Sequence, residues 1–385
     1  MNNLRKVLIV SSLWLLGGAA ALGQEPEVSS MFRSDPQHTG VYRTSGPLTL
    51  CRVKWKFEAG RELAATPAIS GGVVYVGAYG GEFYSLDART GKEARPSVMD
   101  PGRYHFIASP VITDGAVYFL SLNGYLYSRN ASTGANRWPD TGEKKLGRVL
   151  LGEESQDKGV VSSPVVADGI LYVGKADGYL YAVDTRTGKM KWRFKTEASI
   201  ISSPAFADGV VYFGSEDSYL YAVDAATGRQ KWQFLTRDPV MSSPTVIDGM
   251  VYFGGVDRQL YAIDVNTQQE KWRFQTPERI IASPAVHRGQ GLVYIPSEDG
   301  VLYAIDMKTG KERWKSPARA CAFCAPAIAG GMIYIGGGNI LTALDAASGQ
   351  QMWKYVTLSP VSSSPAVADG VVYFGTVGGT LYALE

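Results

Sequence analysis

Histidine and cysteine are scarce in this chain, and their scarcity argues against several kinds of site. Among 385 residues, histidine occurs at His38, His105 and His287, and cysteine at Cys51, Cys321 and Cys324. A histidine-rich metal site is therefore not expected, and three cysteines cannot hold together a protein of this size. The sequence also lacks a P-loop, a G-x-S-x-G elbow and an H-E-x-x-H motif, so it does not indicate the sites that these motifs form.

A charge excess and long apolar runs are missing as well. Lys and Arg number 38 against 36 Asp and Glu, which does not favour general binding to nucleic acid. The main apolar stretch lies in residues 1–23, where Arg5 and Lys6 precede an apolar centre and small residues. This is the layout of a secretory signal peptide; the alternative is an uncleaved membrane anchor, for which the run is short.

These features predict three parts: a signal peptide at 1–23, an N-terminal lead-in at 24–50 and a folded domain at 51–385. The expected location is periplasmic or secreted. No cysteine lies near the expected cleavage point, so a lipid anchor is not indicated. After removal of the signal we expect no transmembrane span, and we expect a monomer.

Glycine and tyrosine, by contrast, are abundant, at 44 and 22 residues, and both belong to a repeat that begins near Ala65. One marker of the repeat is a proline, found at Pro67, Pro110, Pro164, Pro204, Pro244, Pro284, Pro326 and Pro365. A second marker is a tryptophan with an expected structural role, found at Trp55, Trp138, Trp192, Trp232, Trp272, Trp314 and Trp353. Arg95 takes the tryptophan position in the first unit.

One unit, residues 202–236, reads SSPAFADGVVYFGSEDSYLYAVDAATGRQKWQFLT. Its Asp-Gly and Thr-Gly pairs favour tight turns because these residues accept positive φ. The segment YLYAVD alternates with a period of two, which indicates a strand, and its final Asp is expected to cap the following turn. Four antiparallel strands in about 40 residues are typical of a β-propeller blade.

The ends of the repeat predict how the fold closes. The last unit stops at Glu385, after its third strand, and the missing fourth strand is expected at 53–60, which reads VKWKFEAG. The sequence therefore predicts an all-β protein, an eight-bladed β-propeller with four antiparallel strands per blade. Closing the last blade with an N-terminal strand removes an open sheet edge.

The spacing Ala222-x-Asp224-x-x-x-Gly228-x-x-x-Trp232 resembles the tryptophan-docking repeat of quinoprotein alcohol dehydrogenases. The frame recurs in three other units and is weaker in a fourth, where Gln268 replaces the Gly. The opening MFRSDPQHTGVYR is similar to the lead-in of exported proteins with such repeats. The resemblance covers 31–385 and implies the pyrroloquinoline-quinone (PQQ) repeat propellers. These include quinone-dependent dehydrogenases and non-catalytic outer-membrane assembly factors of the BamB type, which are of about this length.

The resemblance implies that a quinone site would lie on the propeller axis, with Ca²⁺, a catalytic Asp, an aromatic floor and, in many members, adjacent bonded cysteines. The expected inner strands contain no Asp, Glu, Asn, Gln or Trp, and their titratable groups are His287 and Cys324. We therefore predict no catalytic residue, metal site or cofactor. The sequence favours an exported scaffold for protein partners, in envelope or outer-membrane protein assembly. The alternatives are a PQQ- and calcium-dependent oxidoreductase and a ligand-sensing propeller.

Binding chemistry is expected where the copies differ. Long loops are predicted at 95–106 and 139–160, and Leu146, Leu150 and Leu151 in the second either contact a partner or pack on the propeller. Five arginines shortly precede a marker proline and either attract carboxylates at the channel mouth or form local salt bridges; they are Arg61, Arg103, Arg237, Arg279 and Arg319.

Two smaller groups of residues are given structural roles. Asp177, Asp217, Asp257 and Asp299 occupy polar turns, where capping of the turn is the simpler explanation than cation binding. Cys321 and Cys324 form a C-x-x-C pair without the strand-then-helix context of a redox motif. We predict a structural disulfide or two buried thiols rather than a redox pair.

Overall fold

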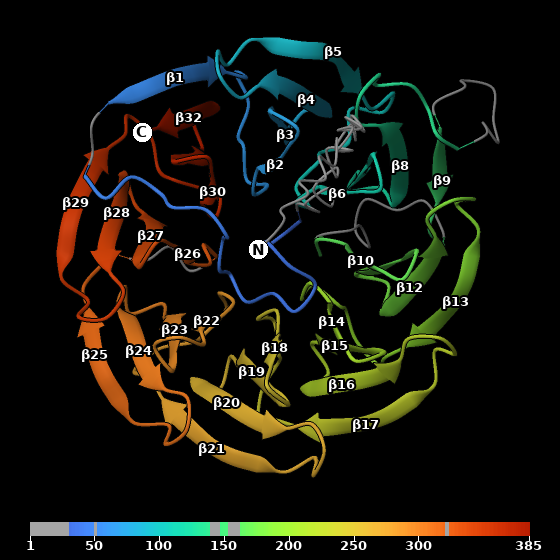
Figure 1. Ribbon diagram of the computed structural model, residues 1–385. Helices are drawn as coiled ribbons and strands as arrows, with labels where there is room; N and C mark the ends of the chain where they lie inside the picture. The colour runs from blue at the N-terminus through green and yellow to red at the C-terminus, as the bar shows by residue number, and fades with distance from the viewer. Residues whose placement is uncertain (1–30, 50–51, 139–146, 153–161, 320–322) are drawn as a thin grey trace, which may run out of the picture.

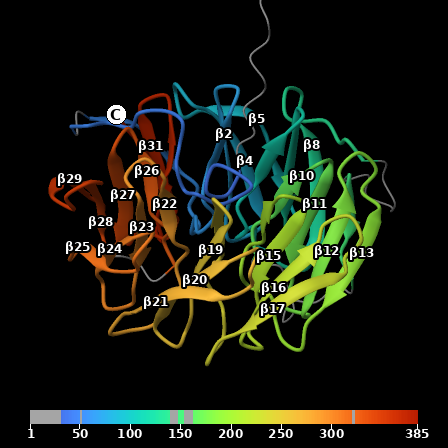
Figure 2. The ribbon, with the colours of Figure 1, turned by 60° about the horizontal axis from the view of Figure 1, so that its bottom comes forward.

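The computed structural model describes residues 31–49, 52–138, 147–152, 162–319 and 323–385. These residues form eight four-stranded antiparallel sheets, arranged as blades around a central axis (Figure 1). The turned view in Figure 2 shows the blades standing side by side around the ring. The predicted eight-bladed β-propeller is therefore confirmed.

The strands of the first four blades run from the axis to the rim in chain order. Blade 1 contains β2 (Ala68–Ser70), β3 (Val73–Gly77), β4 (Glu82–Asp87) and β5 (Glu93–Met99). Blade 2 contains β6 (Val111–Thr113), β7 (Ala116–Leu120), β8 (Tyr125–Asn130) and β9 (Arg148–Leu150). Blade 3 contains β10 (Val165–Ala167), β11 (Ile170–Gly174), β12 (Tyr179–Asp184) and β13 (Met190–Lys195). Blade 4 contains β14 (Ala205–Ala207), β15 (Val210–Gly214), β16 (Tyr219–Asp224) and β17 (Gln230–Leu235).

The remaining blades follow the same order except at the end of the chain. Blade 5 contains β18 (Thr245–Ile247), β19 (Met250–Gly254), β20 (Gln259–Asp264) and β21 (Glu270–Gln275). Blade 6 contains β22 (Ala285–His287), β23 (Leu292–Pro296), β24 (Leu302–Asp306) and β25 (Glu312–Ser316). Blade 7 contains β26 (Ala327–Ala329), β27 (Met332–Gly337), β28 (Ile340–Asp345) and β29 (Gln351–Val356). Blade 8 contains β30 (Ala366–Ala368), β31 (Val371–Gly375), β32 (Thr380–Leu384) and β1 (Val53–Glu58).

Ring closure follows the predicted scheme. Strand β1 pairs antiparallel with β32, with Phe57 opposite Leu381. The indole N–H of Trp353, in blade 7, donates to the carbonyl of Pro47 in the lead-in at 3.0 Å. In four other blades the tryptophan, which is Trp55, Trp138, Trp192 or Trp272, donates to the residue after the next blade's third strand, as Trp192 does to Ala225 at 3.0 Å. For Trp353 the Pro47 carbonyl takes the place of that acceptor.

The turns and the packing explain why each repeat folds as a blade. Asp208 and Gly209 both have positive φ, as a two-residue turn between antiparallel strands requires. The carboxylate of Asp224 accepts hydrogen bonds from the N–H and hydroxyl of Thr227, which confirms the predicted cap. The ring of Trp192 lies against Gly228 of the next blade, where any Cβ would come within 2.6 Å of the indole. Sequence spacing thus sets both the turns and the contact between blades.

Blades 1 and 2 differ from the prediction. Residues 95–99 of the first expected loop belong to β5, and residues 148–150 of the second form β9 as the outer strand of blade 2. Arg95 takes the tryptophan position in β5, and its guanidinium donates to the carbonyl of Ser132 in the next blade. This contact joins the two blades, as an indole does elsewhere. Trp138 is buried and donates to Thr185, but it precedes the outer strand and lies outside it. These two blades are therefore completed by contacts that do not occur in the other blades.

Candidate functional site

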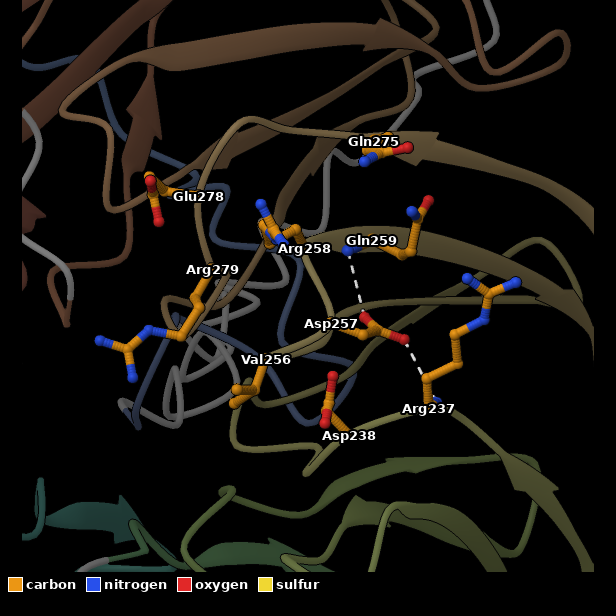
Figure 3. Close-up of a pocket in the computed structure, with 9 residues that line it drawn as sticks. All are labelled: Arg237, Asp238, Val256, Asp257, Arg258, Gln259, Gln275, Glu278 and Arg279. Carbon is orange, nitrogen blue, oxygen red and sulfur yellow. Dashed lines mark hydrogen bonds between the residues drawn. The ribbon is translucent and has the colours of Figure 1, made fainter.

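One face of the propeller carries the loops that join each outer strand to the next inner strand. The five arginines singled out from the sequence are exposed there, each in the loop before a different inner strand. Two of them, Arg237 and Arg279, line one pocket of about 530 Å³ between blades 4, 5 and 6 (Figure 3). The pocket is also lined by Asp238, Val256, Asp257, Arg258, Gln259, Gln275 and Glu278. Arg61, Arg103 and Arg319 lie in the loops of other blades and do not line it.

Arg258 was missed by sequence reasoning, although the repeat contains a signal for it. It occupies the turn between the second and third strands of blade 5, where blades 3, 4 and 6 have Gly178, Ser218 and Gly300. Its backbone φ is +68°, and its guanidinium donates to the carbonyl of Pro277 at 3.3 Å. A large cation in a turn that elsewhere has a small residue is a local departure from the repeat. Comparing the copies column by column would have found it.

The carboxylate of Asp257 connects three groups at the pocket. It accepts hydrogen bonds from the backbone N–H of Gln259 at 3.1 Å, the backbone N–H of Arg237 at 3.3 Å and the hydroxyl of Tyr261 at 2.5 Å. Burial, together with this contact to a carboxylate, raises the pKa of Tyr261, so its hydroxyl stays protonated and donating. The same Asp-to-Tyr pairing occurs in blades 3, 4 and 6. In each of these turns the Asp also accepts a hydrogen bond from the backbone N–H two residues later, which confirms the predicted turn-capping role.

The guanidinium groups of the pocket differ in how they are held. Arg279 forms an ion pair with Glu298 at 2.6 Å, so for this residue the salt-bridge alternative holds. Among the described residues, none forms an ion pair with the Arg237 side chain. Asp238 and Glu278 are exposed at the pocket, so its charges are mixed. Chemically, the arrangement can bind a carboxylate or an amide-rich segment through Arg237 and Arg258.

The other sequence-predicted candidates have separate positions. Leu150 is 39% exposed at the end of β9, whereas Leu151 is buried in the core, so these two leucines do not form one exposed patch. Leu146 lies outside the described residues. The predicted pairing of Cys321 and Cys324 also lies outside them, because Cys321 is not described; Cys324 is buried, with its sulfur 4.0 Å from the carbonyl of Val361.

The axis of the propeller is crossed by the lead-in itself, the blue segment at the centre of Figure 1. Its carbonyls accept hydrogen bonds from the middle residue of four successive inner strands. The pairs are Phe206 N–H with Pro36, Val246 N–H with Gln37, Val286 N–H with Thr39 and Ile328 N–H with Gly40, at 2.7 to 2.9 Å. Sequence reasoning recognised this segment as a lead-in but missed its position.

The lead-in buries charged groups on the axis. Arg33 is 2% exposed and His38 is fully buried. Burial lowers the pKa of Arg33 to about 9, so it remains a cation at neutral pH, and none of the described residues accepts a hydrogen bond from its guanidinium. Burial and the neighbouring Arg33 lower the pKa of His38 to about 3, which keeps this imidazole neutral. Burial raises the pKa of Asp35, whose carboxylate accepts hydrogen bonds from Thr39.

The described residues contain neither a candidate metal site nor a candidate membrane-spanning helix. They contain no cluster of three or more His, Cys, Asp or Glu that could hold a metal ion. Nor does this part of the chain contain a helix long and apolar enough to cross a membrane.

Comparison with solved structures shows the same fold in proteins of different function. The crystal structure of BamB from Moraxella catarrhalis superposes with a TM-score of 0.71 at 18% identity, covering 87% of this chain and 97% of that one. Quinohemoprotein alcohol dehydrogenase from Comamonas testosteroni superposes with a TM-score of 0.74 at 15% identity, covering 93% and 80%. At these identities the likeness shows the fold alone.

Among curated proteins, lupanine 17-hydroxylase [cytochrome c] from a Pseudomonas species is 39% identical over 54 residues. That match covers 14% of this chain and 8% of the relative's length. The profile described as outer membrane protein assembly factor BamB matches residues 51–149, 139–242, 236–321 and 321–385. Because these matches span nearly the whole propeller, the chain belongs to the family described as outer membrane protein assembly factor BamB.

Proposed function

We propose that this chain is an exported, non-catalytic scaffold that binds protein partners during assembly of envelope proteins. The observation that carries the proposal is the position of the lead-in. Residues 36–40 occupy the axis of the propeller and are hydrogen-bonded to the inner strands of blades 4 to 7. In the dehydrogenase branch of the superfamily, the quinone and its Ca²⁺ would lie on that axis. The chain's own backbone takes up this position.

The residues near the axis do not fit a quinone and Ca²⁺. Ca²⁺ takes six to eight oxygen ligands, which in proteins come largely from carboxylates and carbonyls. Asp35 is the carboxylate of the axial segment, but it faces the buried cation of Arg33 and is bound to Thr39. The carbonyls of Pro36, Gln37, Thr39 and Gly40 already accept hydrogen bonds from inner strands. A cation placed beside Arg33 would also be repelled by it.

A second candidate function is supported by the pocket in Figure 3. Arg237 and Arg258 face a concave surface between neighbouring blades, in a loop region that is the usual place for binding residues. A binding propeller that recognises a carboxylate on a small molecule or a peptide is consistent with this geometry. The scaffold remains the better-supported proposal because the family relationship covers the whole ring.

The test is titration of the purified mature protein with PQQ and CaCl₂, followed by calorimetry and by the absorbance of the quinone. We expect no saturable binding and no dye-linked oxidation of alcohols. As a control, the same titration is run on a variant lacking residues before Arg52, which opens the axis but keeps β1. Saturable binding of PQQ to the intact protein would contradict the proposal.

A further inference from the structure

The outer strand of blade 7 departs from a charge pattern that six of the other seven blades share. Lys or Arg precedes each blade tryptophan except Trp353; these cations are Lys54, Arg137, Lys191, Lys231, Lys271 and Arg313. Several of them pair with an acid at the end of the adjoining third strand, as Lys271 does with Asp264 at 3.1 Å. Blade 7 has Met352 instead, and its acid, Asp345, is bound to Ser348. The cation that precedes the tryptophan is therefore missing from this strand, which keeps one cation, Lys354.

The missing cation belongs to a wider apolar surface. Met352 and Val356 are 52% and 64% exposed, and Met352 is the extra residue of a register irregularity between Gln351 and Trp353. Leu358, just beyond the strand, is 93% exposed. Val377 of blade 8 is close by, since its N–H donates to the carbonyl of Pro360 at 2.9 Å. Large apolar side chains thus continue from β29 onto the loop face.

One cation, Lys354, lies between the apolar residues Met352 and Val356. Lys354 lies on the same face of β29 as Val356 and is exposed. In the described part of the chain, no acidic residue forms an ion pair with it. The equivalent position after the tryptophan in blade 5 is Arg273, which forms a two-pronged contact with Glu270. Lys354 is therefore available to a carboxylate from outside the blade.

The backbone of β29 offers the second half of a binding surface. β29 is the last strand of its sheet, and no other described strand pairs with its outer edge. Figure 1 shows it at the rim of the ring, between β25 and β1. Free edges are commonly protected by charged side chains, above all lysine, and an edge with few of them is a template for adding a strand. β29 has one cation, Lys354, whereas β13 has Lys191, Arg193 and Lys195. An added strand gains affinity from backbone hydrogen bonds and specificity from alternate side chains.

We propose that the outer edge of β29 binds an extended segment of a partner protein, which places a carboxylate opposite Lys354 and apolar side chains opposite Met352 and Val356. This inference rests on the proposed scaffold function and names its docking strand. A second copy of the chain fits less well. In a two-fold antiparallel pairing of β29 centred on Lys354, this residue would face its own copy, and like charges directly opposite destabilise a strand pair.

The test uses two labelled heptapeptides that alternate valine and threonine around a central glutamate or a central lysine. Fluorescence anisotropy with the intact mature protein measures their affinities. We expect the glutamate peptide to bind at least roughly tenfold more tightly, a difference of about 1.4 kcal/mol. Lys354→Glu should reverse this preference, which a general loss of folding could not do. The double variant M352K/V356K, which adds cations to the edge, should weaken binding at least about tenfold.

The matched control is Leu235→Lys on β17. Leu235 is 61% exposed at the position of blade 4 that corresponds to Val356, but its strand keeps Lys231 before the tryptophan. This variant should leave peptide binding unchanged. Failure of both peptides to bind, equal binding of the two, or binding that ignores Lys354→Glu would overturn the proposal. Dimerisation in sedimentation that M352K abolishes would also overturn it, because the occupant would then be a second copy.

These outcomes are separate from those of the proposed function. PQQ binding would remove the non-catalytic role and leave the peptide results at β29 as they are. Conversely, a failed peptide experiment would leave the axial segment and its test untouched.

Discussion

Blades 3 to 6 and blades 8, 1 and 2 reach the same architecture by different contacts. In blades 3 to 6 the third-strand tyrosine bonds an Asp four residues earlier in its own turn, as Tyr221 does with Asp217 at 2.9 Å. In blade 2 the corresponding Tyr127 bonds Asp100, which comes from the preceding loop and is fully buried beside Arg148. Blade 1 has Arg95 in the tryptophan position, and blade 8 takes β1 from the other end of the chain.

The regular blades are thus stabilised by contacts within one turn, and the irregular blades by contacts between distant segments of the chain. A contact within one turn is lost without exposing much else, because solvent and neighbouring backbone groups can replace it. A contact between distant segments holds two parts of the chain together and is commonly more buried. Substitutions in the irregular blades should therefore lower the free energy of unfolding more than substitutions in the regular blades.

The largest effect is expected from removing β1. A mature protein that begins at Arg61 loses the outer strand of blade 8 and Trp55, which is 8% exposed. Loss of one such buried aromatic costs about 3–5 kcal/mol. We expect the melting temperature to fall by roughly 10 °C or more relative to a protein that begins at Arg52, which lacks the lead-in but keeps β1. Equal melting temperatures in circular dichroism would show that β1 does not close the ring.

Asp100 and Asp217 provide a direct comparison of the two kinds of clasp. Asp100→Ala removes the partner of the buried Tyr127 hydroxyl and leaves Arg148 without its ion pair. Breaking a buried pair in this way costs about 3–5 kcal/mol, whereas Asp217→Ala removes exposed-side hydrogen bonds worth about 1–2 kcal/mol. Urea denaturation of both variants measures the difference. If Asp217→Ala were the more damaging change, the distinction between local and distant contacts would be wrong.

The same distinction explains what the sequence could predict. The marker prolines and tryptophans repeat at a nearly constant spacing, so they predicted the blades, the turns and the closing strand. Asp100 and Arg148 carry no repeat signal, because their partner lies in a different unit. The path of residues 36–40 across the axis depends on backbone hydrogen bonds to four inner strands, and backbone pairing of an irregular segment has little side-chain pattern.

The candidate pocket could be predicted only in part, because the repeat predicts the position of a loop but not the contacts between blades. Arg237 and Arg279 lie in corresponding loops, each between an outer strand and the next inner strand, so their position on one face followed from the repeat. The ion pair of Arg279 did not follow, because it is formed with Glu298 and not with the adjacent Glu278. Which guanidinium is paired depends on side-chain directions across two blades. The repeat thus predicts on which face a residue lies, but not the partner that it contacts there.

The axial segment predicts a pH dependence. The pKa of His38 is about 3 in the folded protein and 6.5 for the free side chain, so the unfolded chain binds a proton first as the pH falls. Stability associated with His38 is complete above pH 6.5 and is lost as the pH falls toward 3. Between pH 7 and pH 5 the loss is about 2 kcal/mol.

The measurement is urea denaturation of the native protein and of His38→Asn at both pH values. Asn tolerates the positive φ of residue 38 and does not titrate. Asp35 has a raised pKa and Arg33 stays charged, but both are present in each protein, so their effects largely cancel in the difference. The native protein should lose about 2 kcal/mol more than the variant. Equal losses would mean that His38 is not buried in the folded state.

The smallest effect is expected from restoring the repeat in blade 1 with Arg95→Trp. The surroundings of a blade tryptophan are already present there. Tyr75 occupies the position of the tyrosines that contact tryptophan in other blades, and Gly134 lies against the Arg95 side chain where a glycine elsewhere meets an indole. The indole N–H can donate to the carbonyl of Ala131, which now accepts from Tyr75.

The variant exchanges three hydrogen bonds from Arg95, two to the Ser132 carbonyl and one to the Tyr75 hydroxyl, for one indole hydrogen bond and more buried apolar surface. The apolar gain exceeds the loss because the Arg95 contacts to Ser132 are exposed, so we expect stabilisation by about 0.5–1 kcal/mol. Arg95→Ala, which has neither contact, is the control and should destabilise by about 1 kcal/mol. Destabilisation by both substitutions would mean that the site in β5 fits arginine and no longer accepts a tryptophan. The irregular register of β5 against β4 would then be the structural reason.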